Sequence, residues 1–136
     1  MKRKIILTII LIIIVVTCAY YTYNYFISRN FTYQIEECDK TQPQKEDSID
    51  ITLEGNTMHF TQIRNDNCAI NDFLKLKYTK WRNELTINEK FESDIMAMCN
   101  CASEIKGKIS NLKPGKYNIN FKYNNYLLKE TAFEIK

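Results

Sequence analysis

Alternating apolar and polar positions predict that most of the chain after residue 30 is β-strand. Residues 116–123 give the clearest example, with apolar residues at every second position: Tyr117, Ile119, Phe121 and Tyr123. This pattern is typical of a strand with one buried face and one solvated face. Similar alternation, or a short apolar run between turn residues, predicts further strands at residues 31–38, 49–53, 57–63, 73–78, 84–89, 104–110 and 131–135.

Turn residues separate several of these predicted strands. Gly55-Asn56 and Asn124-Asn125 are expected to form hairpin turns, because glycine and asparagine tolerate positive φ angles. The polar residues 41–48 and 64–71 are expected to be loops. Residues 91–102 fit either a single helical turn or an irregular crossover. About eight short strands without a long amphipathic helix predict an all-β fold, an immunoglobulin-like antiparallel β-sandwich of about seven to eight strands.

A short motif near the end of the chain indicates how the two sheets connect. Tyr117 stands at the start of a late strand, shortly after the turn residues Pro114-Gly115. This is the position of a tyrosine corner in sandwich domains. We expect the Tyr117 hydroxyl to donate a hydrogen bond to upstream backbone and so to fix the crossover. The pattern also occurs in simple hairpins.

The N-terminal segment has the composition of a membrane-spanning helix. Lys2, Arg3 and Lys4 precede residues 5–27, which contain no charged residue. About 20 apolar residues in a helix cross a hydrocarbon core of roughly 30 Å. The preceding cations orient the N-terminus toward the cytoplasm, and the tyrosines between positions 20 and 25 suit the opposite interface. We therefore expect residues 1–29 to be a membrane anchor or signal segment, and residues 30–136 to be a domain outside the cytoplasm.

Three fates of this segment remain open from the sequence. It fits an uncleaved single-pass anchor, which leaves the domain attached to the cell membrane. Thr17-Cys18-Ala19 also fits the small-residue site at which a signal peptide is cleaved, which would give a secreted protein. The run Val15-Val16-Thr17-Cys18 is similar to a lipoprotein signal with Cys18 as the lipidated residue, although threonine stands where glycine, alanine or serine is usual.

The charge distribution argues against a nucleic-acid partner. The formal net charge is +3, but the first 29 residues contain four basic residues and no acidic one. Residues 30–136 therefore hold 15 basic and 16 acidic residues, a net charge of −1. A nearly neutral domain has no broad positive field to attract phosphates, so we expect no nucleic-acid binding.

Four cysteines lie in the predicted domain: Cys38, Cys68, Cys99 and Cys101. An even number outside the cytoplasm predicts disulfides, each worth about 2–4 kcal/mol when it closes a long loop. A Cys99–Cys101 bond would close a small strained ring. Two pairings remain, Cys38–Cys99 with Cys68–Cys101 or Cys38–Cys101 with Cys68–Cys99.

The same cysteines allow a sharper alternative. Met96, Met98, Cys99 and Cys101 form a Met-x-Met-Cys-x-Cys cluster, whose soft donors favour Cu(I). A Cys-x-Cys pair can also exchange disulfides when its thiol pKa is low. Methionines beside cystines are more often core residues. His59 is the only histidine, and the sequence contains no Gly-x-Ser-x-Gly, P-loop or His-Glu-x-x-His motif. We therefore expect no enzymatic activity, no catalytic residue, no metal and no cofactor.

Several short segments carry a resemblance to a group of known proteins. They are Asn67-Cys68, Leu85-Thr86-Ile87-Asn88-Glu89, Cys99-Asn100-Cys101 and residues 109–117. Together they resemble small bacterial exported or lipoprotein-like proteins of uncharacterised function that carry one immunoglobulin-like domain with a Cys-x-Cys motif. The resemblance spans roughly residues 58–123 and implies the fold and an exported location, but no activity.

The sequence thus predicts an envelope protein whose β-sandwich binds a partner or has a structural role. Its partners would be the membrane, through the N-terminal segment, and an envelope protein or surface ligand. Contact surfaces of sandwich domains are usually loops at one end, so residues 64–71 and 79–83 are the expected contact loops. Trp81 is expected to be a core or edge-capping residue, with an exposed binding anchor as the alternative.

Overall fold

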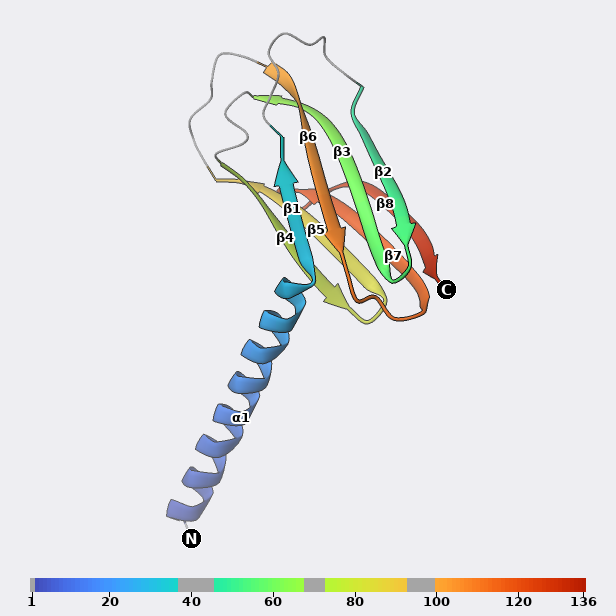
Figure 1. Cartoon of the computed structure of the whole chain (residues 1–136). Helices are drawn as coiled ribbons and strands as arrows, with labels where there is room; N and C mark the ends of the chain where they lie inside the picture. Colours follow the sequence, from blue (N-terminus) through green and yellow to red (C-terminus); the bar gives the residue numbers. More distant parts are fainter. Residues whose placement is uncertain (1, 37–45, 68–72, 93–99) are drawn as a thin grey trace.

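A computed structural model describes residues 2–36, 46–67, 73–92 and 100–136 of the chain. These residues form one N-terminal helix, α1 (Lys2–Arg29), followed by strands arranged in two packed sheets (Figure 1). The strands are β1 (Phe31–Ile35), β2 (Ser48–Glu54), β3 (Thr57–Asn67), β4 (Leu74–Trp81), β5 (Glu84–Phe91), β6 (Asn100–Ile109), β7 (Gly115–Tyr123) and β8 (Tyr126–Ile135). The predicted β-sandwich preceded by one helix is confirmed.

Each sheet contains four strands, in the orders β1-β6-β3-β2 and β4-β5-β7-β8. Five of the neighbouring pairs are antiparallel, whereas β5 and β7 run parallel. The expectation of a purely antiparallel sandwich is therefore wrong for this one pair. After β5 the chain crosses to β6 in the other sheet, and after β6 it crosses back to β7. β7 thus returns beside β5 and runs in the same direction as β5. Alternation along single strands carries no information about such a crossover.

The core lies between the sheets and is built from the inward positions of the predicted alternating strands. The ring centroids of Phe60 and Phe121, which come from different sheets, lie 5.3 Å apart. Gly107 permits this packing, because a Cβ atom there would lie 2.3 Å from the Phe60 ring. The buried cluster comprises Met58, Phe60, Leu74, Leu76, Leu85, Ile87, Ile105, Ile109, Leu112, Tyr117, Ile119, Phe121 and Ile135.

The connections between strands follow the predicted turn chemistry. Gly55, Asn124 and Asn125 all have positive φ angles, as hairpin turns require. The Tyr117 hydroxyl donates a hydrogen bond to the Lys113 carbonyl at 3.0 Å, which is the contact expected of a tyrosine corner. The β6–β7 crossover is thereby tied to the start of β7.

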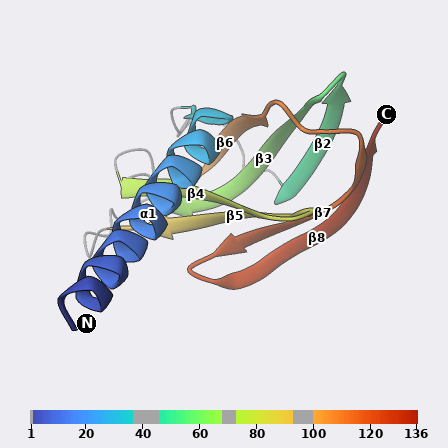
Figure 2. The same cartoon turned by 90° about the horizontal axis from the view of Figure 1, so that it is seen from below.

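The two edges of the sandwich differ in what they contact. At one edge, β1 and β4 lie side by side, with the rings of Phe31 and Tyr78 stacked 5.2 Å apart, and α1 contacts both strands. At the other edge β2 faces β8, and Lys129 Nζ donates a hydrogen bond to the Ile49 carbonyl. Figure 2, viewed from the helix end, shows α1 beside the first edge and the C-terminus at the second.

Candidate functional site

A groove of about 500 Å³ runs along the β2–β8 edge of the sandwich. Carboxylates stand on its β2 side, and Lys129 of β8 bridges to the backbone of β2. The floor includes Gln62 and Arg64 of β3. They occupy inward positions of the strand, as the apolar residues Met58 and Phe60 do before them. The lining residues are Asp47, Ser48, Ile49, Asp50, Gln62, Ile63, Arg64, Leu128 and Lys129.

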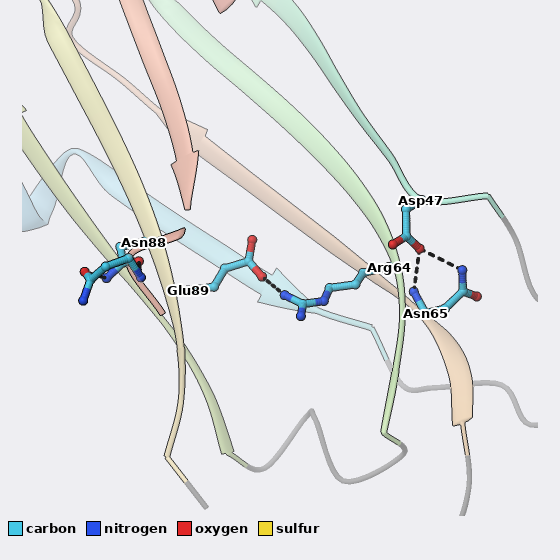
Figure 3. Close-up of polar contacts among 6 residues, drawn as sticks. Asp47, Arg64, Asn65, Asn88 and Glu89 are labelled. Carbon is cyan, nitrogen blue, oxygen red and sulfur yellow. Dashed lines mark hydrogen bonds and ion pairs between the residues drawn. The ribbon is translucent and has the colours of Figure 1, made fainter. Parts of the chain in front are cut away.

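An ion pair between the two sheets lies at the floor of this groove. Arg64 of β3 donates a hydrogen bond to Glu89 of β5, with 2.7 Å between Nη1 and Oε2 (Figure 3). The Glu89 side chain is fully buried, and that of Arg64 is 14% exposed. The Arg64 guanidinium also lies 3.8 Å from the centroid of the Tyr123 ring. A buried carboxylate costs several kcal/mol unless it is paired, so Arg64 and Glu89 depend on each other.

Two further polar side chains are buried in the same part of the core. Gln62 is 2% exposed and Ser103 is 1% exposed. Among the described residues, neither Gln62 Oε1 nor Ser103 Oγ finds a hydrogen-bond partner. An oxygen buried in this way costs about 1–3 kcal/mol. Gln62 lines the groove, and its unpartnered Oε1 atom is buried.

Local hydrogen bonds fix the wall of the groove. Asp47 Oδ1 accepts hydrogen bonds from both the backbone N and Nδ2 of Asn65, at 2.9 and 2.8 Å (Figure 3). These bonds hold the residue that precedes β2 against β3, next to Arg64. A reciprocal pair of bonds between Asn88 and Asn125 ties β5 to the turn between β7 and β8 in the same way.

The structure places the predicted contact loops differently from the sequence analysis. Residues 64–67 belong to β3, where they pair with β6, so the expected loop at residues 64–71 begins as strand; residues 68–72 lie outside the described residues. Residues 79–81 likewise belong to β4, and the turn is confined to Arg82 and Asn83. Trp81 is 70% exposed, so it is not a core residue; it ends the edge strand β4.

The predicted cysteine site is described only in part. Cys101 is 3% exposed and takes part in a disulfide bond. Cys38, Cys68 and Cys99 lie outside the described residues, as do Met96 and Met98. Cys18 is exposed on α1 and is not disulfide-bonded.

Among the described residues, His59, the only histidine of the sequence, does not lie in a cluster of metal ligands. His59 of β3 approaches one carboxylate, with 3.6 Å between its Nε2 and Glu54 Oε2. Within the described part of the chain, no group of three or more histidine, cysteine, aspartate or glutamate side chains is arranged to hold a metal ion.

Sequence reasoning missed Arg64 and Glu89, although a signal for both was present. In β5, Leu85, Ile87 and Glu89 occupy successive inward positions, and all three are buried. Arg64 continues the inward series of β3 in the same way, after Phe60 and Gln62. Glu89 lies within a predicted strand, and Arg64 directly follows one and continues its inward series, so charged residues of opposite sign at these positions indicate an internal ion pair.

No family model, curated protein or solved structure matches this chain.

Proposed function

We propose that this protein is a membrane-anchored β-sandwich module outside the cytoplasm that binds a ligand in the groove between β2 and β8, without catalysing a reaction. The observation that carries the proposal is the groove of about 500 Å³, whose lining includes Gln62, a side chain with a buried Oε1 atom that has no hydrogen-bond partner among the described residues. Binding sites are mostly concave and hold a few fixed polar groups. The Arg64–Glu89 pair and the Asp47–Asn65 bonds keep this floor and wall in place.

The chemistry of the groove favours a ligand that donates hydrogen bonds. Gln62 Oε1 is an acceptor, and the carboxylates of Asp47 and Asp50 add further acceptors along the wall. The cations of the groove are already engaged, Arg64 by Glu89 and Lys129 by the Ile49 carbonyl. Leu128 offers an apolar contact on the opposite side. A compound that bears hydroxyl or amine groups on a compact carbon frame, such as an amino sugar, fits this arrangement.

Ligand-observed NMR with the full-length protein in detergent tests the groove. Glucosamine and a set of neutral disaccharides serve as probes. We expect saturation transfer to at least one probe, and loss of the signal in Gln62→Leu, which removes the acceptor. The matched control Gln34→Leu changes the same residue type at an exposed position of β1 and should leave the signal unchanged. A signal that survives Gln62→Leu, or no signal from any probe, contradicts binding in this groove.

The proposed location depends on α1. Its window Ile6–Tyr23 has a mean hydropathy of 2.3, and none of it is buried inside the structure. Such a segment is long enough to span a bilayer, and the basic residues before it favour a cytoplasmic N-terminus.

The mass of the mature protein tests the three fates of this segment. An intact chain supports the anchor, loss of the segment supports a cleaved signal, and a lipid adduct on Cys18 supports a lipoprotein.

We further propose that the four cysteines of the domain form two disulfides. Cys101 occupies an inward position of β6, as Ser103 and Ile105 do. On the neighbouring strand, the backbone N of Glu36 donates a hydrogen bond to the Glu104 carbonyl at 2.8 Å. Cys38 follows Glu36 by only two residues, so the chain length allows it to reach Cys101.

The register of β3 and β6 supports the second bond. Asn67 pairs with Asn100 in this antiparallel ladder. In the sequence, Cys68 directly follows Asn67 and Cys99 directly precedes Asn100, so both cysteines are one residue from this pair, which favours a bond between them. Of the two pairings that the sequence leaves open, we therefore expect Cys38–Cys101 with Cys68–Cys99.

Peptide mapping without reduction distinguishes these arrangements. We expect the two disulfide-linked peptides of this pairing and no reactive thiol in the denatured domain. The opposite pairing would contradict the register argument. Two or more free thiols in the domain, or stoichiometric uptake of Cu(I), would instead support the thiol-redox or Cu(I)-binding alternative.

A further inference from the structure

The junction between α1 and the sandwich contains no spacer. α1 ends at Arg29 and β1 begins at Phe31, so Asn30 alone joins them. The Asn30 carbonyl accepts a hydrogen bond from the backbone N of Ser110 at 2.9 Å, and its Oδ1 atom accepts one from Asn111 Nδ2 at 2.9 Å. The helix end is therefore tied to the crossover between β6 and β7. Wherever the helix lies, this end of the sandwich lies beside it.

A second contact brings the end of β4 alongside the helix. The Tyr23 hydroxyl donates a hydrogen bond to the Lys80 carbonyl at 3.0 Å. Tyr23 is the last residue of the apolar window and precedes Arg29 by six residues, or about 9 Å of helix rise. The Lys80 carbonyl therefore lies beside the last turns of the helix, near the level at which the apolar window ends. Figure 1 shows the β4–β5 turn, the β2–β3 turn and the β6–β7 crossover at this same end.

The side chains at this end combine an exposed tryptophan with cations. Trp81 is 70% exposed, and the Arg82 guanidinium lies 5.9 Å from the centroid of its ring. A shallow depression there is lined by Trp81, Arg82, Asn83, Glu84, Lys116 and Asn118. Glu84 is the acidic residue among them, and Arg82 and Lys116 outnumber it. Tryptophan and basic residues are typical of the membrane–water interface.

A cleft of about 170 Å³ between the helix and the sandwich adds two further lysines, Lys80 and Lys113. Partial burial lowers the pKa of Lys80, and the positive charge of Lys113 lowers it further. Two cations are thus held close enough to repel each other. An anionic group bound between them would relieve this repulsion.

We infer that this end of the sandwich is a second membrane contact, in which Trp81 enters the interface and Lys80, Arg82, Lys113 and Lys116 bind the phosphates of anionic lipids. The inference rests on the proposed membrane anchor, because α1 is what brings this end to the bilayer. The occupant is the lipid surface rather than a protein, since a single-residue junction and the Tyr23–Lys80 bond leave no room for a protein between them.

The chain offers a direct probe, because Trp81 is its only tryptophan. Full-length protein is placed in nanodiscs of phosphatidylcholine alone or mixed with phosphatidylglycerol, and Trp81 fluorescence is recorded. We expect a blue shift relative to detergent, weak quenching by acrylamide and strong quenching by brominated lipid. The shift should be larger with the anionic lipid. It should shrink toward the phosphatidylcholine value in the variant Lys113→Gln/Lys116→Gln.

Lys122→Gln is the matched control, because Lys122 lies near the far end of β7, the strand that also carries Lys116. It should leave the spectra unchanged. Full acrylamide quenching of Trp81 together with no effect of brominated lipid would overturn the inference. Equal spectra in the two lipids would overturn the binding of anionic phosphates.

Labelling of Cys18 with a maleimide distinguishes failure of the second membrane contact from failure of the proposed anchor. Cys18 lies within the apolar window and is not disulfide-bonded. If a membrane-impermeant maleimide cannot label Cys18 while Trp81 stays in water, α1 is inserted and only the second contact is wrong. If Cys18 is labelled in the nanodiscs, the proposed anchor itself is wrong.

Discussion

The buried ion pair between Arg64 and Glu89 predicts that replacing the arginine lowers the free energy of unfolding more than replacing the glutamate does. Arg64→Met leaves the Glu89 carboxylate fully buried with its cation removed. Removing one partner of a buried pair costs about 3–5 kcal/mol, and we expect a loss of that size in the free energy of unfolding. Glu89→Leu leaves a guanidinium that is 14% exposed and stacked on Tyr123. We expect that variant to lose only about 1–2 kcal/mol, because the arginine head can reach water.

The double variant Arg64→Met/Glu89→Leu completes the cycle. Replacing both charges with apolar side chains of similar size is often neutral or stabilising. We therefore expect the double variant to unfold within about 1 kcal/mol of the unmodified protein, which gives a coupling energy of at least about 3 kcal/mol.

Urea unfolding of the full-length protein in detergent, followed by far-ultraviolet circular dichroism, measures these free energies. The reasoning is refuted if Arg64→Met costs no more than Glu89→Leu, or if the two effects simply add. Either result would mean that water or another cation satisfies Glu89 when Arg64 is gone.

Three further predictions concern the core and the connections of the sandwich. Gly107→Ala places a methyl group 2.3 Å from the buried Phe60 ring, so urea unfolding should show a loss of about 1–3 kcal/mol. Tyr117→Phe removes the hydrogen bond to the Lys113 carbonyl and should cost about 1 kcal/mol in the same assay; no loss would deny the tyrosine corner a stabilising role. Burial raises the pKa of the Tyr78 hydroxyl, and neighbouring Tyr117 raises it further, so stability present below about pH 10 is lost as the pH rises above it. Tyr78→Phe should remove this loss, which is no more than about 1 kcal/mol at about pH 11 because the hydroxyl is partly solvated; equal declines in both proteins would contradict it.

The β-sandwich was predictable because its strands have one buried and one solvated face. That alternation gave the position of β7 to within one residue and gave most of the other strands at least in part. The parallel pairing of β5 and β7 could not be predicted, because it depends on where the chain crosses between sheets. The start of β8 was missed because Tyr126, Leu127 and Leu128 are all exposed and do not alternate.

The candidate groove was not predicted from the sequence. Residues 64–71 were expected to be a loop because they are polar, yet Arg64 and Asn65 are strand residues. Their polarity reflects a buried ion pair and the wall of a groove rather than solvent exposure. Trp81 was expected to be a core or edge-capping residue, but its side chain is 70% exposed at the end of β4, where the Lys80 carbonyl accepts a hydrogen bond from Tyr23 of α1. Tertiary contacts of this kind leave no periodic pattern in the sequence.

Protease accessibility of the chain in a bacterial host tests the membrane placement of the sandwich most directly. An epitope tag follows Lys136, and spheroplasts are treated with protease before and after lysis. We expect the tagged protein to remain with the membranes during alkaline extraction, and the tag to be lost from intact spheroplasts. A tag that is protected until lysis, on a protein found in the soluble fraction, would contradict both the anchor and the location outside the cytoplasm.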